Sequence, residues 1–365
     1  TTCKADLTYA SIEMLKKTAV IVLINLLCYT LSNAQTLIGS VLDENKQPVV
    51  GASVYFDGTA IGTITNANGQ FTLQLKNRIS APLVISSLGY ETQLVQNAFD
   101  HPNLAIQLKP KPYQIGEVVV KKDRFSRKQK MKAFRAQFLG TSRAGKSCII
   151  KNESDVDLYF NAETNTLVAT SDKPLVIVNK HLGYTITVNL VNFNVTYRKT
   201  SLNSDHVKSS LFLVTTFFSD TEQNNTKIEK RRSKCYQGST LNFFRDLSLG
   251  KWSEKGFLLY SGSIPAIPSQ YFTVSDTLDL KKVVVTNSIK GVVVSIDSQN
   301  IKIPFISSFN LLYKNRKQSK IVFKTGTIYI DKYGVNTSPE LIQLGGDMGR
   351  KRLGDLLPFD YSIEI

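Results

Sequence analysis

Residues 52–56 and 71–75 each place apolar side chains at every second position, with polar neighbours between them. A period of two predicts strands that bury one face and expose the other. Asn68-Gly69 comes directly before the second stretch and suits a hairpin turn that needs positive φ. With the spacing of the other turn residues, Thr36–Leu108 is predicted to form about seven short strands, as in a small β-sandwich.

Helical spacing replaces this alternation in Arg124–Leu139, a stretch without Pro or Gly. Met131, Phe134 and Phe138 fall on one side of a helix there, and Ser126 is the expected N-cap. We predict a basic amphipathic helix whose three apolar side chains pack on a second domain. The alternative is a helix that lays these side chains on a membrane.

From Cys148 onward, β-type stretches dominate the sequence. The predicted strands are Leu158–Phe160, Thr166–Ser171, Leu175–Asn179, Tyr184–Leu190, Leu211–Phe218, Gly256–Tyr260, Lys282–Thr286, Gly291–Ile296 and Ile321–Ile330. A helical stretch is expected near Leu241–Leu247. The chain is therefore predicted to be mainly β, with an N-terminal seven-stranded sandwich and a larger β-rich domain with a few helices.

A short apolar run near the start indicates export. Lys16 and Lys17 precede the run Thr18–Tyr29, and the small residues Ser32 and Ala34 follow it. This pattern is typical of a secretory signal peptide, with cleavage expected after Ala34. The alternative is a membrane anchor, but the run is shorter than the ~20 residues that span a bilayer.

These elements divide the chain into four segments. Residues 1–34 are expected to be upstream sequence and signal peptide, which are removed. Residues 35–109 are the predicted sandwich, and residues 110–135 are a linker stiffened by two prolines and continued by the basic helix. Residues 136–365 are the predicted larger domain.

Positive charge is concentrated between the two predicted domains. The chain carries a formal net charge of +16, and Lys109–Arg135 contains ten basic residues against two acidic ones. Export argues against nucleic acid as the partner. A solvated helix face is the expected explanation of this charge, and contact with an anionic membrane or lipopolysaccharide surface is the alternative. The candidate contacts are Lys121, Lys122, Arg124, Arg127, Lys128, Lys130, Lys132 and Arg135.

Turn glycines and apolar strand positions of the first domain carry a family resemblance. The matching positions are Gly39, Val41, Asp43, Pro48, Gly51, Ala52, Val54, Gly58, Thr59, Gly62, Thr63, Gly69, Phe71, Leu73, Gly89 and Tyr90. This stretch resembles the carboxypeptidase-regulatory-like domain, an Ig/transthyretin-like sandwich on many envelope proteins of Gram-negative bacteria. The resemblance implies a fold and a compartment, periplasmic or associated with the outer membrane, and no reaction.

The rest of the chain carries a second, less specific resemblance. FLG (138–140), CIIKN (148–152), LGY (182–184), YQGS (236–239) and DLLPFDY (355–361) resemble the body that follows this sandwich in bacterial "carboxypeptidase-like regulatory domain-containing" proteins. A similar sandwich also extends TonB-dependent receptors at the N-terminus. The chain after the linker is too short for a receptor plug and a barrel of about 22 strands, so only an accessory role in such uptake is compatible.

Gly140–Ser147 fits the pattern G-x-x-x-x-G-K-[ST] of phosphate-binding loops. Such a loop works when a buried strand leads into it and a helix leaves it. Here a predicted helix precedes the match and the β-like Cys148–Asn152 follows, so we expect a helix-to-strand connection and no nucleotide.

No other pattern indicates catalysis, a metal or a cofactor. His101, His181 and His206 lack the H-x-x-E arrangement of metallocarboxypeptidases. Cys148 and Cys235 are expected to be two separate thiols, although a disulfide between them is compatible with export.

The expected function is therefore that of a non-enzymatic, exported binding or scaffolding protein of the bacterial envelope, with an envelope protein or glycan as partner. An accessory component of TonB-dependent uptake is the first alternative. An envelope hydrolase acting on carbohydrate or peptide is the second.

Overall fold

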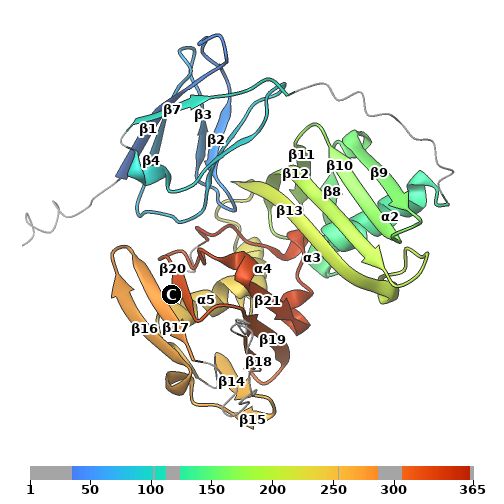
Figure 1. Cartoon of the computed structure of the whole chain (residues 1–365), viewed down its shortest axis with the longest axis vertical. Coiled ribbons are helices and arrows are strands. Elements are labelled where there is room, and N and C mark those ends of the chain that lie inside the picture. Colours follow the sequence, from blue (N-terminus) through green and yellow to red (C-terminus); the bar gives the residue numbers. More distant parts are fainter. Residues whose placement is uncertain (1–34, 102, 112–123, 254, 287–305, 362–365) are drawn as a thin grey trace, which may run out of the picture.

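The computed structural model describes residues 35–101, 103–111, 124–253, 255–286 and 306–361. Strands predominate in these ranges and helices are few, which confirms the predicted mainly β class. Figure 1 shows three lobes, which we define as the first lobe (35–111), the second lobe (124–220) and the third lobe (240–349). The predicted signal peptide, the candidate contacts Lys121 and Lys122, and the predicted strand Gly291–Ile296 lie outside the described residues.

The first lobe is a sandwich of two sheets. One sheet has the order β4-β1-β7 and the other has the order β3-β2-β5-β6. The strands are β1 (Gln35–Leu42), β2 (Ser53–Phe56), β3 (Gly62–Ile64), β4 (Gln70–Leu75), β5 (Leu83–Ser86), β6 (Gln93–Val95) and β7 (Asn103–Gln107). In β4, buried and exposed residues alternate strictly, as its apolar pattern predicts.

The turn before β4 differs in one respect from the prediction. Gly69 has a φ of 70°, which confirms the expected positive φ. However, β3 and β4 belong to different sheets, and β4 pairs with β1 instead. The Asn68-Gly69 turn therefore carries the chain from one sheet to the other and does not close a hairpin.

The second lobe is built on two long strands. Its elements are α2 (Arg127–Phe138), α3 (Arg143–Lys146), β8 (Cys148–Ile150), β9 (Val156–Asn161), β10 (Thr166–Ser171), β11 (Leu175–Asn179), β12 (Tyr184–Tyr197) and β13 (Val207–Asp220). One side of β12 pairs with β13, and the other side pairs with β11 in its first half and β10 in its second half. The predicted strands β12 and β13 are therefore confirmed but extend further than their sequence pattern indicated.

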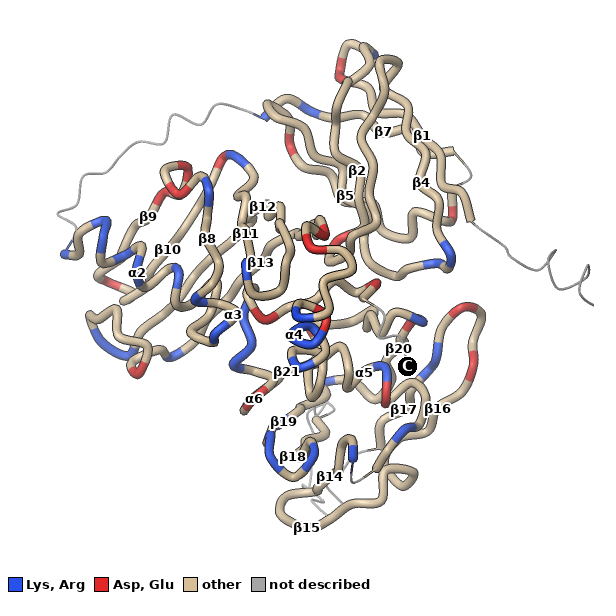
Figure 2. Tube along the Cα trace, turned by 180° about the vertical axis from the view of Figure 1, so that it is seen from behind, with Lys and Arg blue, Asp and Glu red and all other residues tan. Residues whose placement is uncertain are grey.

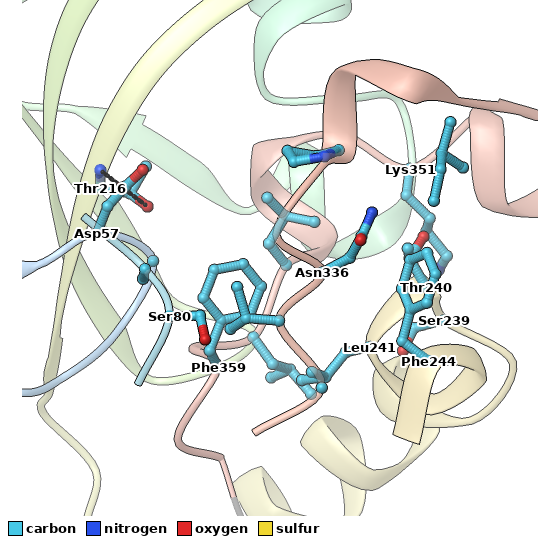
Figure 3. A pocket seen from close by; sticks show the side chains of 18 of the residues that line it. Asp57, Ser80, Thr216, Ser239, Thr240, Leu241, Phe244, Asn336, Lys351 and Phe359 are labelled. Carbon is cyan, nitrogen blue, oxygen red and sulfur yellow. Dashed lines mark hydrogen bonds between the residues drawn. The ribbon is translucent and has the colours of Figure 1, made fainter. Parts of the chain in front are cut away.

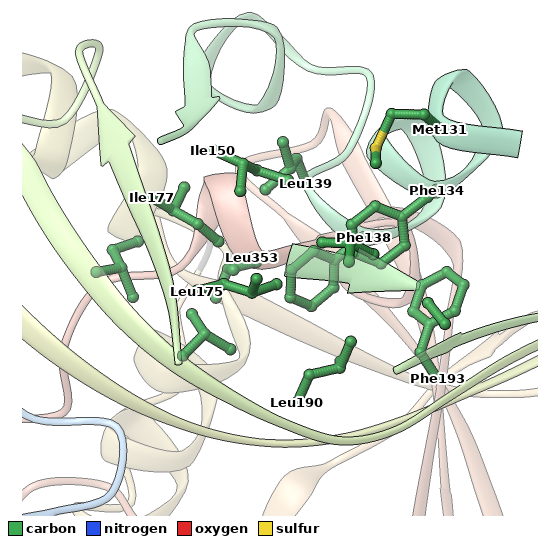
Figure 4. Close-up of a cluster of buried hydrophobic side chains, with 14 of the residues drawn as sticks. Met131, Phe134, Phe138, Leu139, Ile150, Leu175, Ile177, Leu190, Phe193 and Leu353 are labelled. Carbon is green, nitrogen blue, oxygen red and sulfur yellow. The ribbon is translucent and has the colours of Figure 1, made fainter. Parts of the chain in front are cut away.

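Helix α2 packs against this sheet (Figure 4). Ser126 caps it through a capping box with Gln129, as the sequence predicts. Phe134 and Phe138 are buried, and their rings lie 4.8 and 6.0 Å from the ring of Phe193 on β12. Met131, Phe134 and Phe138 therefore pack in the core of the second lobe, as the sequence predicts.

The third lobe has its own two sheets, of order β15-β14-β18-β19-β21 and β16-β17-β20. Its elements are α5 (Thr240–Ser248), β14 (Phe257–Ser261), β15 (Ile264–Pro265), β16 (Phe272–Thr277), β17 (Leu280–Val285), β18 (Ser307–Tyr313), β19 (Lys317–Phe323), β20 (Thr327–Ile330), β21 (Ile342–Gly345) and α6 (Gly346–Gly349). Both sheets and α5 contribute to one cluster of buried side chains.

One sequence expectation for this region needs correction. Within residues 136–365, which the sequence predicts as one domain, the buried side chains form one cluster in the second lobe and another in the third. The stretch Ile321–Ile330 was expected as one strand, but it is split between β19 and β20, which lie in different sheets.

Helix α4 (Thr226–Tyr236) links the second and third lobes. Its Arg232 has a side chain only 3% exposed, which forms ion pairs with Asp220 and Glu229. The guanidinium also donates to two backbone carbonyls and stacks 4.0 Å from the ring centre of Tyr184. This one side chain therefore fixes α4 on the end of the β12–β13 pair.

Residues 351–361, which we call the C-terminal segment, run between the three lobes. The amide of Gly354 donates to Leu139 O at 3.0 Å, and the amide of Phe359 donates to Gly58 O at 2.7 Å. Arg245 of α5 donates to Phe359 O at 2.8 Å. The segment therefore bonds to all three lobes and holds them in one arrangement.

Short 3-10 turns complete the described structure. They are Ala98–Asp100, Glu153–Asp155, Ser204–His206, Pro268–Gln270, Pro339–Leu341 and Leu353–Asp355.

Candidate ligand cavity

A cavity of about 600 Å³ lies where the three lobes and the C-terminal segment meet (Figure 3). This size falls within the ~300–1,000 Å³ range of ligand pockets. Its apolar lining comprises Ala81, Pro82, Val214, Phe218, Leu241, Phe244, Val335, Ile342, Leu344, Leu357 and Phe359. Exposed lining residues, among them Gln96, Thr337 and Leu356, mark where it opens to solvent.

The first lobe closes one side of the cavity through the loop after β2. Gly58 N donates to Thr216 O at 2.8 Å, and Phe218 N donates to Thr59 O at 2.9 Å. Through these bonds the loop pairs with the edge of β13, and Thr59 and Phe217 form a parallel β-bridge between them. Gly58 has a φ of 73°, and a Cβ there would overlap the Phe359 ring. Glycine is therefore required at this position on both backbone and packing grounds.

Asp57 is the carboxylate on this side of the cavity. Its Oδ1 accepts from Thr216 N at 2.7 Å. Burial raises the pKa of Asp57 to about 6, although hydrogen bonds from Thr216 and Gly58 lower it. The pKa of Asp57 therefore lies close to neutral pH, and hydrogen bonds, mainly from backbone amides, stabilise its ionised form.

Asn336 lies on the third-lobe side, after β20. The residue is 8% exposed, and its Oδ1 accepts from Ser338 N at 3.2 Å. Its Nδ2 is buried and has no hydrogen-bond partner among the described residues. In Figure 3 the side chain reaches between the Asp57–Phe359 side and the Thr240–Lys351 side of the cavity. A donor is therefore left unused at the wall of an apolar space.

The remaining charged lining residues belong mainly to the C-terminal segment. Lys351 Nζ lies 3.7 Å from Asp355 Oδ1, in an ion pair. Burial raises the pKa of the Cys235 thiol, which also lines the cavity. A neutral thiol is a weak nucleophile, so burial leaves the Cys235 thiol unactivated.

The basic helix presents fewer free cations than its sequence suggests. Lys130 was expected to contact an anionic surface, but it is 8% exposed and its Nζ donates to Leu158 O at 2.7 Å. Arg135 forms an ion pair with Glu153, and Arg127 donates to the carbonyl of the same residue. Exposed Arg124, Lys128 and Lys132 remain on or beside α2, where Figure 2 shows basic residues along the helix.

The phosphate-loop match has the predicted setting between helix α2 and strand β8. Its amides are used internally, since Gly145 N donates to Ser142 Oγ and Ser147 N donates to Ala144 O. The C-terminal segment covers the loop, because a Cβ on Gly354 would lie 2.5 Å from Gly145 Cα. This geometry supports a packed connection.

Histidines and cysteines form no metal site in the described parts of the chain, where no group of three or more His, Cys, Asp or Glu could hold an ion. Cys148 and Cys235 are both free thiols in this structure. Burial raises the pKa of Cys148 to about 12. Of the helices described, none is long and apolar enough to cross a bilayer.

The sequence motifs contribute to the cavity only in part. Of the family positions, Gly58 lines it directly, and Gly62 lies against the Phe217 ring of β13. Other family positions, such as Gly39 and Gly69, serve the interior of the sandwich. Asp57 and Asn336 were not predicted. No sequence pattern pointed to these two residues. The terminal DLLPFDY stretch was noted in the sequence, and it supplies the lining residues Leu357 and Phe359.

Comparison with known proteins assigns a family to the first lobe. Residues 37–120 match the CarboxypepD_reg-like domain. No curated protein matches the chain. Among solved structures, the chain is similar to a 9R-lipoxygenase from Cyanothece PCC8801, with 9% identity over 61% of this chain and 49% of that chain and a TM-score of 0.18. The chain spans about half the length of that protein, and a TM-score this low supports no shared fold or activity. The N-terminal sandwich of this protein is a CarboxypepD_reg-like domain.

Proposed function

We propose that this protein is a non-enzymatic, exported binding protein of the bacterial cell envelope, and that the central cavity is its ligand site. The observation that carries the proposal is the cavity itself, a mainly apolar space of about 600 Å³ lined by residues of all three lobes. Apolar pockets with a few polar groups are the usual form of small-molecule sites.

Export rests on the sequence pattern of residues 16–34 and on the envelope proteins that carry similar sandwiches. N-terminal sequencing of the native protein from a Gram-negative host should begin at Gln35. A cytoplasmic product that retains Met14 would contradict export.

Ligand binding is tested by filling the cavity. Leu241→Trp places a larger side chain at the lining position of α5, and Leu249→Trp makes the same change at an exposed position outside the cavity. Both proteins are compared with the wild type for binding of the neutral dye N-phenylnaphthylamine, whose fluorescence rises in apolar surroundings. Folding of each variant is checked by its thermal melt.

We expect the wild type and Leu249→Trp to bind the dye alike, and Leu241→Trp to lose most of the binding while it still melts cooperatively. Equal binding by all three proteins would show that the dye does not enter this cavity and would contradict the proposal. An absence of binding by the wild type would contradict it as well.

A contact with an anionic envelope surface remains a separate part of the proposal. It is supported by the exposed cations Arg124, Lys128 and Lys132. Binding to anionic vesicles should weaken between low and physiological salt, because the Debye length falls from about 30 Å to about 8 Å. Lys128→Gln with Lys132→Gln should weaken it further without changing the melt, and salt-independent binding would contradict the contact.

A further inference from the structure

We infer that the central cavity takes a neutral, mainly aliphatic molecule with one carbonyl-type oxygen, and that Nδ2 of Asn336 donates to that oxygen. The inference rests on the proposed function and names the class of ligand. It follows from the orientation of Asn336, the balance of charge in the lining, and the apolar walls.

The orientation of the Asn336 amide is set by its neighbour. The backbone N–H of Ser338 can only donate, so the atom of Asn336 that meets it at 3.2 Å must be the oxygen. This leaves Nδ2 as the end without a partner among the described residues. A buried donor without an acceptor lowers stability, and a ligand oxygen would remove that cost.

The charge balance of the lining argues against a charged ligand. The lining contains three acidic side chains, Asp57, Glu340 and Asp355, and one basic side chain, Lys351. The Lys351 ammonium is already paired with Asp355 at 3.7 Å. A ligand carboxylate would therefore meet an excess of negative charge. An ammonium would have no lone pair for Nδ2 of Asn336, since it only donates. A neutral acceptor satisfies both conditions.

The apolar walls of the cavity indicate the chemistry of the rest of the ligand. Leu241 and Phe244 come from α5, Val335 from the third lobe, and Leu357 and Phe359 from the C-terminal segment. These side chains offer no hydrogen bonds, so the ligand gains affinity there only through apolar contact. An aliphatic body around a single polar group matches this lining.

The test compares probes of similar length that differ in one end group. Methyl decyl ketone supplies a neutral acceptor, dodecane supplies none, dodecanoate supplies a charged acceptor and dodecylamine supplies a charged donor. Their affinities for the mature wild-type chain are measured by displacement of N-phenylnaphthylamine. One net hydrogen bond corresponds to roughly a tenfold change in affinity, so the ketone should bind about tenfold more tightly than dodecane. Both charged probes should bind more weakly than the ketone.

Asn336→Asp keeps the oxygen that accepts from Ser338 N and replaces Nδ2 with a second oxygen. At alkaline pH, where this carboxyl is ionised, the variant should lose about tenfold in ketone affinity and keep its affinity for dodecane. Asn336→Leu removes the donor without adding charge and should give the same result. Asn66→Asp is the matched control, because Asn66 also accepts backbone amides in an exposed turn and lies outside the cavity.

The outcomes separate this inference from the proposed function. Dodecane binding that persists in an Asn336 variant shows that the variant is folded and that its cavity is open. If the ketone then binds no better than dodecane to the wild type, or if both Asn336 variants bind the ketone as the wild type does, the inference is wrong while the ligand site stands. If Leu241→Trp leaves the binding of every probe unchanged, the ligand site itself is wrong.

Discussion

Replacing Asp57 by Asn should make the protein more stable at neutral pH and leave its stability at acidic pH nearly unchanged. Asn has the same shape, and its Oδ1 can still accept from Thr216 N, which lies 2.7 Å from Asp57 Oδ1. The substitution therefore removes the ionisable group while it keeps the contact between the first and second lobes.

The magnitude follows from the pKa of Asp57. Burial raises it from 3.8 to about 6. Because this pKa is higher in the folded chain than in the unfolded chain, the group's stabilising contribution is fully present below pH 3.8 and is lost as pH rises through about 6. At 1.36 kcal/mol for each unit of pKa, the loss is at most about 3 kcal/mol, and partial exposure of Asp57 reduces it to about 1–3 kcal/mol.

The assay is chemical denaturation of the wild type and Asp57→Asn at several pH values. Other buried acids, such as Asp331 and Asp360, also have pKa values raised by burial, so the informative quantity is the difference between the two proteins. That difference should grow by about 1–3 kcal/mol between pH 4 and pH 7. Thr216→Val is the control, because it removes only the Thr216 hydroxyl and keeps both the carboxylate and the backbone amide that donates to it, so the loss of stability with rising pH should persist. A difference that stays constant with pH would refute the reasoning.

Three further predictions concern the framework of the fold. Gly69→Val should lower the stability of the first lobe by about 3 kcal/mol, because a β-branched residue resists positive φ and a Cβ there would lie 2.5 Å from Val41 O. An unchanged thermal melt would contradict the positive φ of this turn. Arg232→Met should cost about 3 kcal/mol in denaturation, because it leaves Asp220 without its buried cation; a loss under 1 kcal/mol would contradict this role. Calorimetry with ATP and magnesium should show no heat of binding, and micromolar affinity that Lys146→Ala abolishes would contradict our interpretation of the loop.

Local sequence patterns were sufficient to predict a strand or helix whose conformation depends on residues within the element itself. The alternation in β4 and the cap and apolar spacing of α2 depend on side chains a few positions apart, and all are found as predicted. Pairing was harder. The Asn68-Gly69 turn was recognisable as a turn. However, β4, which follows this turn, pairs with β1, about thirty residues away in sequence, and local patterns do not show that pairing.

The cavity could not be predicted because its groups come from distant parts of the chain. Asp57 and Thr216 meet only because the loop after β2 adds to the edge of β13. Asn336 is one polar residue in a polar turn, and its unused donor becomes apparent only when every neighbouring acceptor is known. Lys130 shows the opposite error. As a basic residue in a basic stretch it was expected on the surface, but it is buried and its Nζ donates to Leu158 O of β9.

The position of the cavity would tie the proposed ligand binding to the arrangement of the lobes. Asp57 belongs to the first lobe, Val214 to the second and Val335 to the third, while Phe359 of the C-terminal segment lies against Gly58. A molecule that binds only when these surfaces are together stabilises their arrangement by its own binding free energy. The CarboxypepD_reg-like domain then contributes to the site as one of its walls, because the turn glycine at position 58 leaves room for the Phe359 ring. If the proposed site binds its ligand, the family domain and the rest of the chain act as one binding unit, since neither part alone encloses the cavity.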